Sequence, residues 1–162
     1  MTSSAYVAAL RMLTTRRLTE AALFARLERK GYPEDEVGAA VTRCKAERFL
    51  DDRLFAQLHV ESALERRNVG DRRIVAELVR KGVDPDAARA AVSSGQRPER
   101  ERAQAALERM LRVEPGRGYA SLARALERLG FHTPLIYEVL RRHAAQFGPL
   151  AELAEEASSA EE

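Results

Sequence analysis

The sequence predicts an all-α protein made of three tandem tri-helical repeats. Alanine, leucine, arginine and glutamate dominate its 162 residues, aromatic residues make up only 6%, and tryptophan is absent. This composition is typical of helices and excludes an all-β fold. Apolar side chains recur at helical spacing, and one short string ending in glycine occurs three times. With 45% hydrophobic residues, the chain has enough apolar material for a core.

The repeated string has leucine first, arginine third and glycine fifth. Its copies are Leu27–Gly31, Leu78–Gly82 and Leu126–Gly130. An apolar residue follows each glycine, and a proline comes shortly afterwards. Glycine just past a helix tolerates a left-handed cap, and proline in the next first turn loses no hydrogen bond. The string therefore predicts the same tight corner between two helices in every repeat.

The first repeat, residues 1–50, is expected to contain helices over 3–15, 19–30 and 33–47. The apolar stripes that predict them are Tyr6, Leu10 and Leu13, then Leu23 and Leu27, then Val37, Val41 and Cys44. These side chains recur every three or four residues, the spacing of one helix face. Cys44 lies on its stripe and is expected to be buried as a small apolar residue, not to act as a nucleophile.

The second repeat, residues 51–97, is expected to contain helices over 52–67, 71–81 and 85–95. Their stripes are Phe55 and Leu58, then Ile74 and Leu78, then Ala88 and Val92. Asp51 and Asp52 suggest paired carboxylates, but acids directly before an apolar helix favour a helix cap. Asp84, which precedes Pro85, is predicted to cap the third helix.

The third repeat, residues 98–148, is expected to contain helices over 98–112, 117–129 and 134–147. Their stripes are Ala103, Ala106, Leu107, Met110 and Leu111, then Leu122 and Leu126, then Ile136, Val139 and Leu140. Thr133 is predicted to cap the last helix. Residues 149–162 form an acidic tail with five glutamates and no lysine or arginine. Because a single three-helix unit is marginally stable, neighbouring repeats are expected to share buried surface and form an elongated, curved, monomeric rod.

Catalytic, cofactor-binding and metal-binding residues are not expected in this chain. The single cysteine and the scattered His59, His132 and His143 do not assemble a metal site and form no internal disulfide. The phosphate-binding loop, the nucleophile elbow and the paired-histidine zinc motif are all missing from the sequence. There is neither a secretory signal nor an apolar run of the roughly 20 residues that cross a bilayer. A cytoplasmic protein that is not an enzyme is therefore expected.

Basic residues carry the strongest functional signal. The formal net charge of +2 rises to +7 without the five glutamates of residues 148–162, and residues 66–81 alone carry +4. On a helical wheel, Arg29, Arg80 and Arg128 lie opposite the apolar stripes at equivalent places. Two interpretations stay open: contact with an anionic partner, or solvated charge that complements the helix dipole. The candidate partner-binding residues are Arg29, Lys30, Arg66, Arg67, Arg72, Arg73, Arg80, Lys81 and Arg128.

Two further strings, Phe49–Ala56 (FLDDRLFA) and Arg72–Leu78 (RRIVAEL), stand in order with the corners. Together these features resemble the RecX family over residues 5 to 147. The resemblance implies a cytoplasmic regulator that lies in the groove of the RecA nucleoprotein filament and limits its growth, strand exchange and co-protease activity. Homologous recombination, DNA repair and the SOS response are the processes implied. Leu129 replaces the corner lysine, and residues 66–70 read RRNVG, which departs from the usual family pattern.

Direct DNA binding is the alternative function, because tri-helical units also frame helix-turn-helix proteins. Asn68 is the only asparagine and the four glutamines are spread over different repeats, so base-specific reading is not expected. Weak, salt-sensitive and sequence-nonspecific phosphate contact is compatible with the basic residues. A passive helical scaffold for another partner shares the same fold and is a third possibility.

Overall fold

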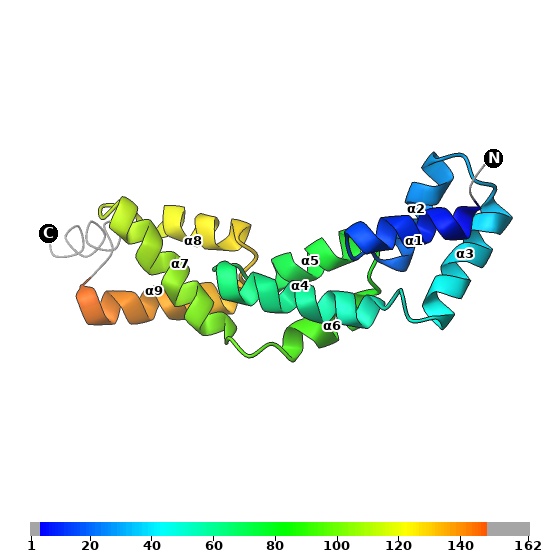
Figure 1. The fold of residues 1–162 in the computed structure, drawn as a ribbon. Helices are drawn as coiled ribbons and strands as arrows, with labels where there is room; N and C mark the ends of the chain where they lie inside the picture. Colours follow the sequence, from blue (N-terminus) through cyan, green and yellow to red (C-terminus); the bar gives the residue numbers. More distant parts are fainter. Residues whose placement is uncertain (1–3, 149–162) are drawn as a thin grey trace, which may run out of the picture. The chain divides into compact units, whose positions relative to one another are not determined.

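The computed structural model describes residues 4–148, and within this range the chain folds into nine α-helices without a β-strand (Figure 1). The helices are α1 (Ala5–Thr15), α2 (Glu20–Arg29), α3 (Glu34–Ala46), α4 (Asp52–Arg66), α5 (Asp71–Arg80), α6 (Pro85–Ser93), α7 (Glu99–Val113), α8 (Tyr119–Arg128) and α9 (Thr133–Phe147). The all-α repeat fold is confirmed, and each end lies within two residues of its predicted position. The predicted acidic tail lies outside the described residues.

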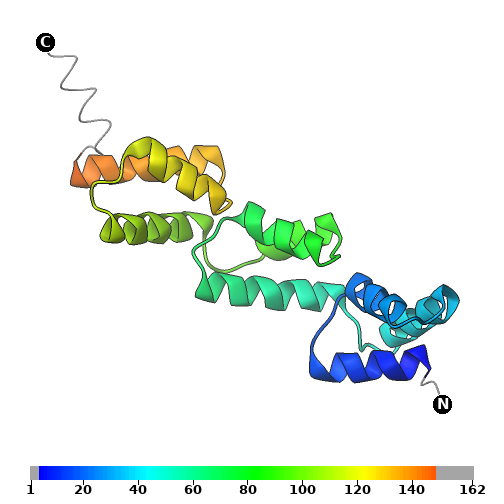
Figure 2. The same ribbon diagram turned by 90° about the horizontal axis from the view of Figure 1, so that it is seen from above.

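The described residues divide into two compact units. One comprises residues 4–61 and 75–94, and the other comprises residues 62–74 and 95–148. Helices α4 and α5 each contain residues of both units, whereas α1–α3 and α6 belong to one unit and α7–α9 to the other. The colour bar of Figure 2 gives the place of each helix along the chain. The middle sequence repeat therefore contributes to both units.

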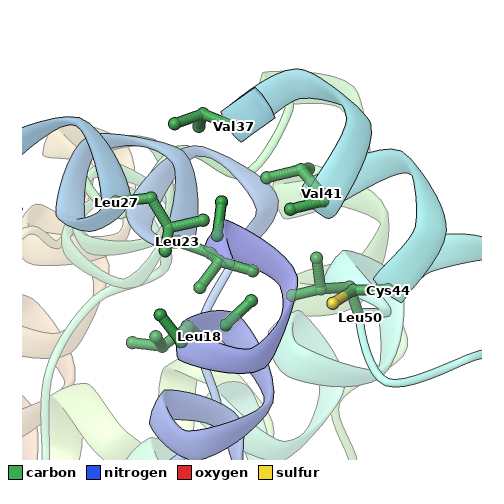
Figure 3. Packing of buried hydrophobic residues seen from close by; sticks show 11 residues of the cluster. Leu18, Leu23, Leu27, Val37, Val41, Cys44 and Leu50 are labelled. Carbon is green, nitrogen blue, oxygen red and sulfur yellow. The ribbon is translucent and has the colours of Figure 1, made fainter. Parts of the chain in front are cut away.

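The core of the first repeat forms where α1 and α2 both pack against α3. Leu23, Leu27, Val37 and Cys44 are completely buried there. Figure 3 shows these side chains converging with Leu18 and Val41. The predicted burial of Cys44 is confirmed, and this burial raises the pKa of its thiol.

A polar cluster at the surface ties α1 to the end of α3. The Tyr6 hydroxyl donates a hydrogen bond to Glu47 Oε2, and Arg43 Nε donates to Glu47 Oε1 at 2.8 Å. The Arg43 guanidinium also lies 3.9 Å from the centre of the Tyr6 ring. These two hydrogen bonds, that from Tyr6 above all, lower the pKa of Glu47.

The core of the third repeat follows the same plan, because α7 and α8 both pack against α9. Phe131, Leu107, Leu122, Leu126 and Leu140 are completely buried there. Phe131 directly follows the corner glycine and fills the space between helices that the smaller Val83 occupies in the middle repeat. The residue after the corner glycine is therefore buried in the second and third repeats, whereas its first-repeat equivalent, Tyr32, is only half-buried.

The three predicted corners all form. Gly31, Gly82 and Gly130 have φ angles of +87°, +91° and +91°, a left-handed conformation that residues with a Cβ adopt at a cost. Asp84 caps α6, as predicted, by accepting hydrogen bonds from the backbone N–H groups of Asp86 and Ala87. The predicted cap at Thr133 is wrong. His132 occupies the N-cap position of α9, so Thr133 is already inside the helix.

Candidate partner-binding surface

The middle helix of each repeat ends on an exposed arginine. Helices α2, α5 and α8 end at Arg29, Arg80 and Arg128, two residues before the corner glycine. The left-handed glycine stops each helix at this point, so the arginine lies in the last turn. A cation there complements the partial negative charge of the helix C-terminus. The fold thus presents a guanidinium at the same position three times.

The corner of one repeat contacts the start of the middle helix of the preceding repeat. The Thr19 hydroxyl donates a hydrogen bond to the carbonyl oxygen of Lys81. At the equivalent place, the backbone N–H of Gly70 donates to the carbonyl oxygen of Leu129 at 2.9 Å. In both junctions the acceptor is the carbonyl oxygen of the residue before the corner glycine, although the donor is a side chain in one and a backbone N–H in the other.

Glycine is required at these junctions by contact as well as by conformation. A Cβ on Gly82 would overlap the Cβ of Ala21, and a Cβ on Gly130 would lie 2.7 Å from the backbone nitrogen of Arg73. A Cβ on Gly31, in contrast, would meet nothing within 4 Å. The second and third corners thus pack closely against the starts of α2 and α5, whereas nothing lies within 4 Å of a Cβ at the first corner.

Acidic side chains complete both junctions. Asp52 Oδ1 accepts a hydrogen bond of 2.9 Å from the backbone N–H of Glu20, the first residue of α2. Glu99 Oε1 accepts one of 2.8 Å from the backbone N–H of Asp71, the first residue of α5. Burial raises the pKa of the Asp52 carboxyl. The middle helices of the first two repeats, α2 and α5, therefore each receive a carboxylate at the N-terminus from the next repeat.

The structure bears out the cap interpretation of the two neighbouring aspartates, with one refinement. Asp51 caps its own helix, because its Oδ1 accepts a hydrogen bond of 2.9 Å from the backbone N–H of Leu54. Asp52 caps α2 instead. The two carboxylates thus serve different helices.

Two arginines that sequence reasoning missed fix the basic loop between α4 and α5. Arg97 donates hydrogen bonds to the Leu64 carbonyl oxygen at 3.0 Å and to Asn68 Oδ1 at 2.8 Å. Arg102 is buried, donates to the carbonyl oxygen of Val69, and pairs with Asp71 at 2.5 Å. The sequence could have indicated the burial of Arg102, because this residue lies four positions before Ala106 on the apolar face of α7. The only asparagine thus has a structural partner.

Eight of the nine candidate partner-binding residues are exposed, and Arg67 is half-buried. The structure brings Arg73 to Arg128, whose carbonyl oxygen accepts a hydrogen bond of 3.4 Å from Arg73 Nη1. It also places Arg66 and Arg67 together on one cavity. Within residues 4–148, no ion pair engages Arg66, Arg72 or Arg80. Arg72 and Arg80 are therefore better placed than Arg73 to meet an outside group.

Two of the three histidines lie beside glutamates. His59 is half-buried and its Nε2 lies 3.2 Å from Glu77 Oε2, and His132 Nδ1 lies 4.0 Å from Glu99 Oε2. The part of the chain that the structure describes holds no group of three His, Cys, Asp or Glu residues arranged for a metal ion. In the same part, no helix is both long enough and apolar enough to span a membrane.

The repeated corners, the shared junctions and the exposed arginines define a tandem tri-helical repeat protein whose distinctive surface is basic. Residues 5–44 match the family model described as "RecX, first three-helix domain", and residues 51–92 match "RecX, second three-helix domain". The chain belongs to the RecX family, and its role is that of a RecX regulatory protein.

Curated relatives match most of this chain. The "Regulatory protein RecX" of Mycobacterium avium is 36% identical over 155 residues, which cover 91% of this chain and 83% of the relative. That of Thermobifida fusca is 33% identical over 138 residues, covering 82% and 74% of the two chains. The crystal structure of RecX from Lactobacillus salivarius shares the fold, with a TM-score of 0.77 at 18% identity over 85% of this chain and 93% of that one.

Proposed function

We propose that this protein binds the RecA nucleoprotein filament and limits its growth, and with it strand exchange and co-protease activity. It acts in the cytoplasm as a monomer, by binding alone, without turnover, cofactor or metal. Membership of the RecX family supports this function. The structural observation that carries it is the exposed arginine at the end of each middle helix, Arg29, Arg80 and Arg128.

Equivalent cationic positions suit a partner that is itself a repeating assembly. A guanidinium binds carboxylates and phosphates through a planar pair of donors. Several weak contacts held on one chain bind much more tightly than each contact alone, provided that their spacing allows simultaneous engagement. Three tandem repeats can therefore address successive subunits of a filament.

The middle repeat adds the strongest charge to this surface. Arg72 and Arg80 are exposed and without an ion pair in the described part of the chain. Arg73 is also exposed, but its guanidinium is hydrogen-bonded to the Arg128 carbonyl. We assign Arg72 and Arg80 to partner contact and Arg73 chiefly to positioning the neighbouring corner. Arg29, Lys30, Lys81 and Arg128 complete the contact at the corners.

The test is filament assembly with purified RecA, single-stranded DNA and ATP, followed with and without this protein. Growth is expected to slow or stop as the protein is added, and strand exchange should fall with it. Unchanged assembly at a saturating concentration of the protein would refute the proposal.

Direct, sequence-nonspecific DNA binding is a second candidate, favoured by the same exposed arginines. Asn68, the only asparagine, is engaged by Arg97, so it is not available to read adenine edges. Binding of the protein to single-stranded DNA without recombinase, measured over a salt titration, separates the two functions. If phosphate contacts dominate, affinity without recombinase should be appreciable and should fall steeply with salt.

A further inference from the structure

An open cavity of about 460 Å³ lies between the end of α4 and one face of α7. Its floor is apolar and includes Val69, Ala106, Met110 and Leu129. Val113 at its edge is 81% exposed, an unusual position for a branched apolar side chain. The cavity therefore has room and apolar surface for one or two bulky aliphatic side chains.

Four arginines surround this floor: Arg66, Arg67, Arg109 and Arg117. Among the described residues that line the cavity, Glu114 is the only acidic one, and its carboxylate lies 3.9 Å from Arg117 Nε. Arg117 is also held in place by a hydrogen bond of 3.0 Å from its Nε to Ser121 Oγ. An apolar floor inside a ring of guanidinium groups suits a ligand that carries aliphatic side chains next to carboxylates.

The cavity is rigid on the side of the basic loop. Arg97 holds Leu64 and Asn68, and the buried Arg102 holds Val69 and Asp71. Because these contacts fix the backbone on which Arg66 and Arg67 stand, little ordering is required when a ligand binds. A preformed site of this kind binds more tightly than one that must first be assembled.

The acidic end of this chain has the chemistry that the cavity selects. Residues 149–162 contain Glu152, Glu155, Glu156, Glu161 and Glu162 without a lysine or arginine, and they also contain Leu150 and Leu153. We propose that the cavity binds this segment, with the leucines on the apolar floor and the glutamates toward the four arginines. The proposed ligand of the cavity is thus the C-terminal segment of the same chain, residues 149–162.

The connection is long enough for this contact. Helices α7 and α9 pack against each other and each has 15 residues, a length of about 22 Å. The segment of 14 residues that follows residue 148 spans up to about 46 Å when extended. From the end of α9, Leu150 and Leu153 lie two and five residues beyond residue 148 and reach up to about 7 Å and about 17 Å, whereas the glutamates that follow Leu153 reach farther along α7.

The contact covers Arg66 and Arg67, so the segment competes with an anionic partner for them. This competition rests on the proposed function, but the contact within the chain does not. Its test needs no recombinase, and failure of one proposal is therefore distinguishable from failure of the other.

The full chain can be tested by nuclear magnetic resonance, because its three methionines are Met1, Met12 and Met110. Met110 lines the cavity, whereas Met12 lies in the first repeat. A spin label is attached at Ser158→Cys in a Cys44→Ala background, and the methionine methyl groups carry ¹³C. We expect the Met110 methyl signal to be broadened severalfold more than the Met12 signal, and high salt should reduce this difference.

The matched control is a chain whose five tail glutamates are replaced by glutamine, because its tether has the same length. Docking predicts that the Met110 broadening falls to the control level in Arg109→Glu/Arg117→Glu and in Leu150→Ser/Leu153→Ser. Circular dichroism verifies that each variant is folded. Equal broadening of Met110 in the glutamate and glutamine chains would overturn the proposal, since the tether alone would then account for it.

Discussion

Arg102 of α7 pairs with Asp71, the first residue of α5, through Nη2 and Oδ1 atoms 2.5 Å apart. The arginine side chain is 3% exposed and that of the aspartate is 40% exposed. Arg102 also donates a hydrogen bond to the Val69 carbonyl oxygen. One buried guanidinium thus joins the third repeat to the loop and helix that carry the densest positive charge of the chain.

Replacing Arg102 with methionine is expected to lower the free energy of unfolding by about 3 kcal/mol, since the Val69 carbonyl loses its buried donor and Asp71 its partner. Urea denaturation measures this loss. Arg100→Met is the matched control, because the Arg100–Glu138 pair is exposed and such pairs contribute about 0–1 kcal/mol. Similar losses of unfolding free energy in the two variants would show that the buried contacts of Arg102 contribute no more to stability than an exposed ion pair.

The corner glycines offer a comparison that separates backbone conformation from contact. Gly31→Ala and Gly82→Ala both place alanine at a left-handed φ angle, at a cost of about 1–2 kcal/mol. Only the Gly82 variant also collides with Ala21, which adds about 1–3 kcal/mol. Denaturation midpoints are the measurement, and equal destabilisation would argue against the packed second corner.

Charge reversal tests the proposed partner contact. Arg72→Glu/Arg80→Glu should weaken filament inhibition by several-fold to about a hundredfold. Since both side chains are exposed, each change should alter stability by only about 0.5 kcal/mol. Filament assembly gives the inhibition, and thermal denaturation gives the stability. Glu155→Lys/Glu156→Lys is the control, which should leave inhibition unchanged or strengthen it. Full inhibition by the arginine variant across a salt titration would assign these residues to ordinary surface charge.

Cys44 should be nearly inert in the folded protein. Its side chain is completely buried, and burial raises the pKa of its thiol, so both access and the thiolate population are low. A thiol-specific reagent at neutral pH is expected to react slowly with the native protein and fast after denaturation. Comparable rates in the two states would place the first-repeat core, and α3 in particular, in doubt.

Glu47 should contribute to acid sensitivity. Hydrogen bonds from Tyr6 and Arg43 lower its pKa below the ordinary value of 4.5, so its stabilising contribution is present above that value and is lost as the pH falls through the lowered pKa. Between about pH 7 and about pH 3, the parent protein should lose more stability than Glu47→Gln. Urea midpoints at both pH values measure the difference, and identical losses would contradict it.

Local patterns predicted the helices and corners well because helical spacing, glycine and proline act within a few residues. The buried Cys44 and the caps at Asp51 and Asp84 are of this kind. The contacts of Arg102 and Asp52 could not be predicted in this way, since their partners lie 31 and 32 residues away. Thr133 failed for a local reason: the helix begins one residue earlier than the following proline suggested. The helical wheel predicted that Arg29, Arg80 and Arg128 are exposed. The hydrogen bond from Arg73 to the Arg128 carbonyl oxygen could not be predicted, because the two residues are 55 positions apart.

The carboxylates of Asp52 and Glu99 belong, by sequence, to the repeat after the one whose middle helix they cap. A three-helix unit whose middle helix is capped at its N-terminus therefore extends past the end of its sequence repeat, to the acidic residue that the next repeat supplies. A gene fragment cut at the predicted boundary after residue 50 would encode the first three helices without the acid that caps α2. Exchange or duplication of these modules preserves a capped helix only when the breakpoint falls beyond that acid, and a designer who adds or removes a repeat has to offset the splice in the same way.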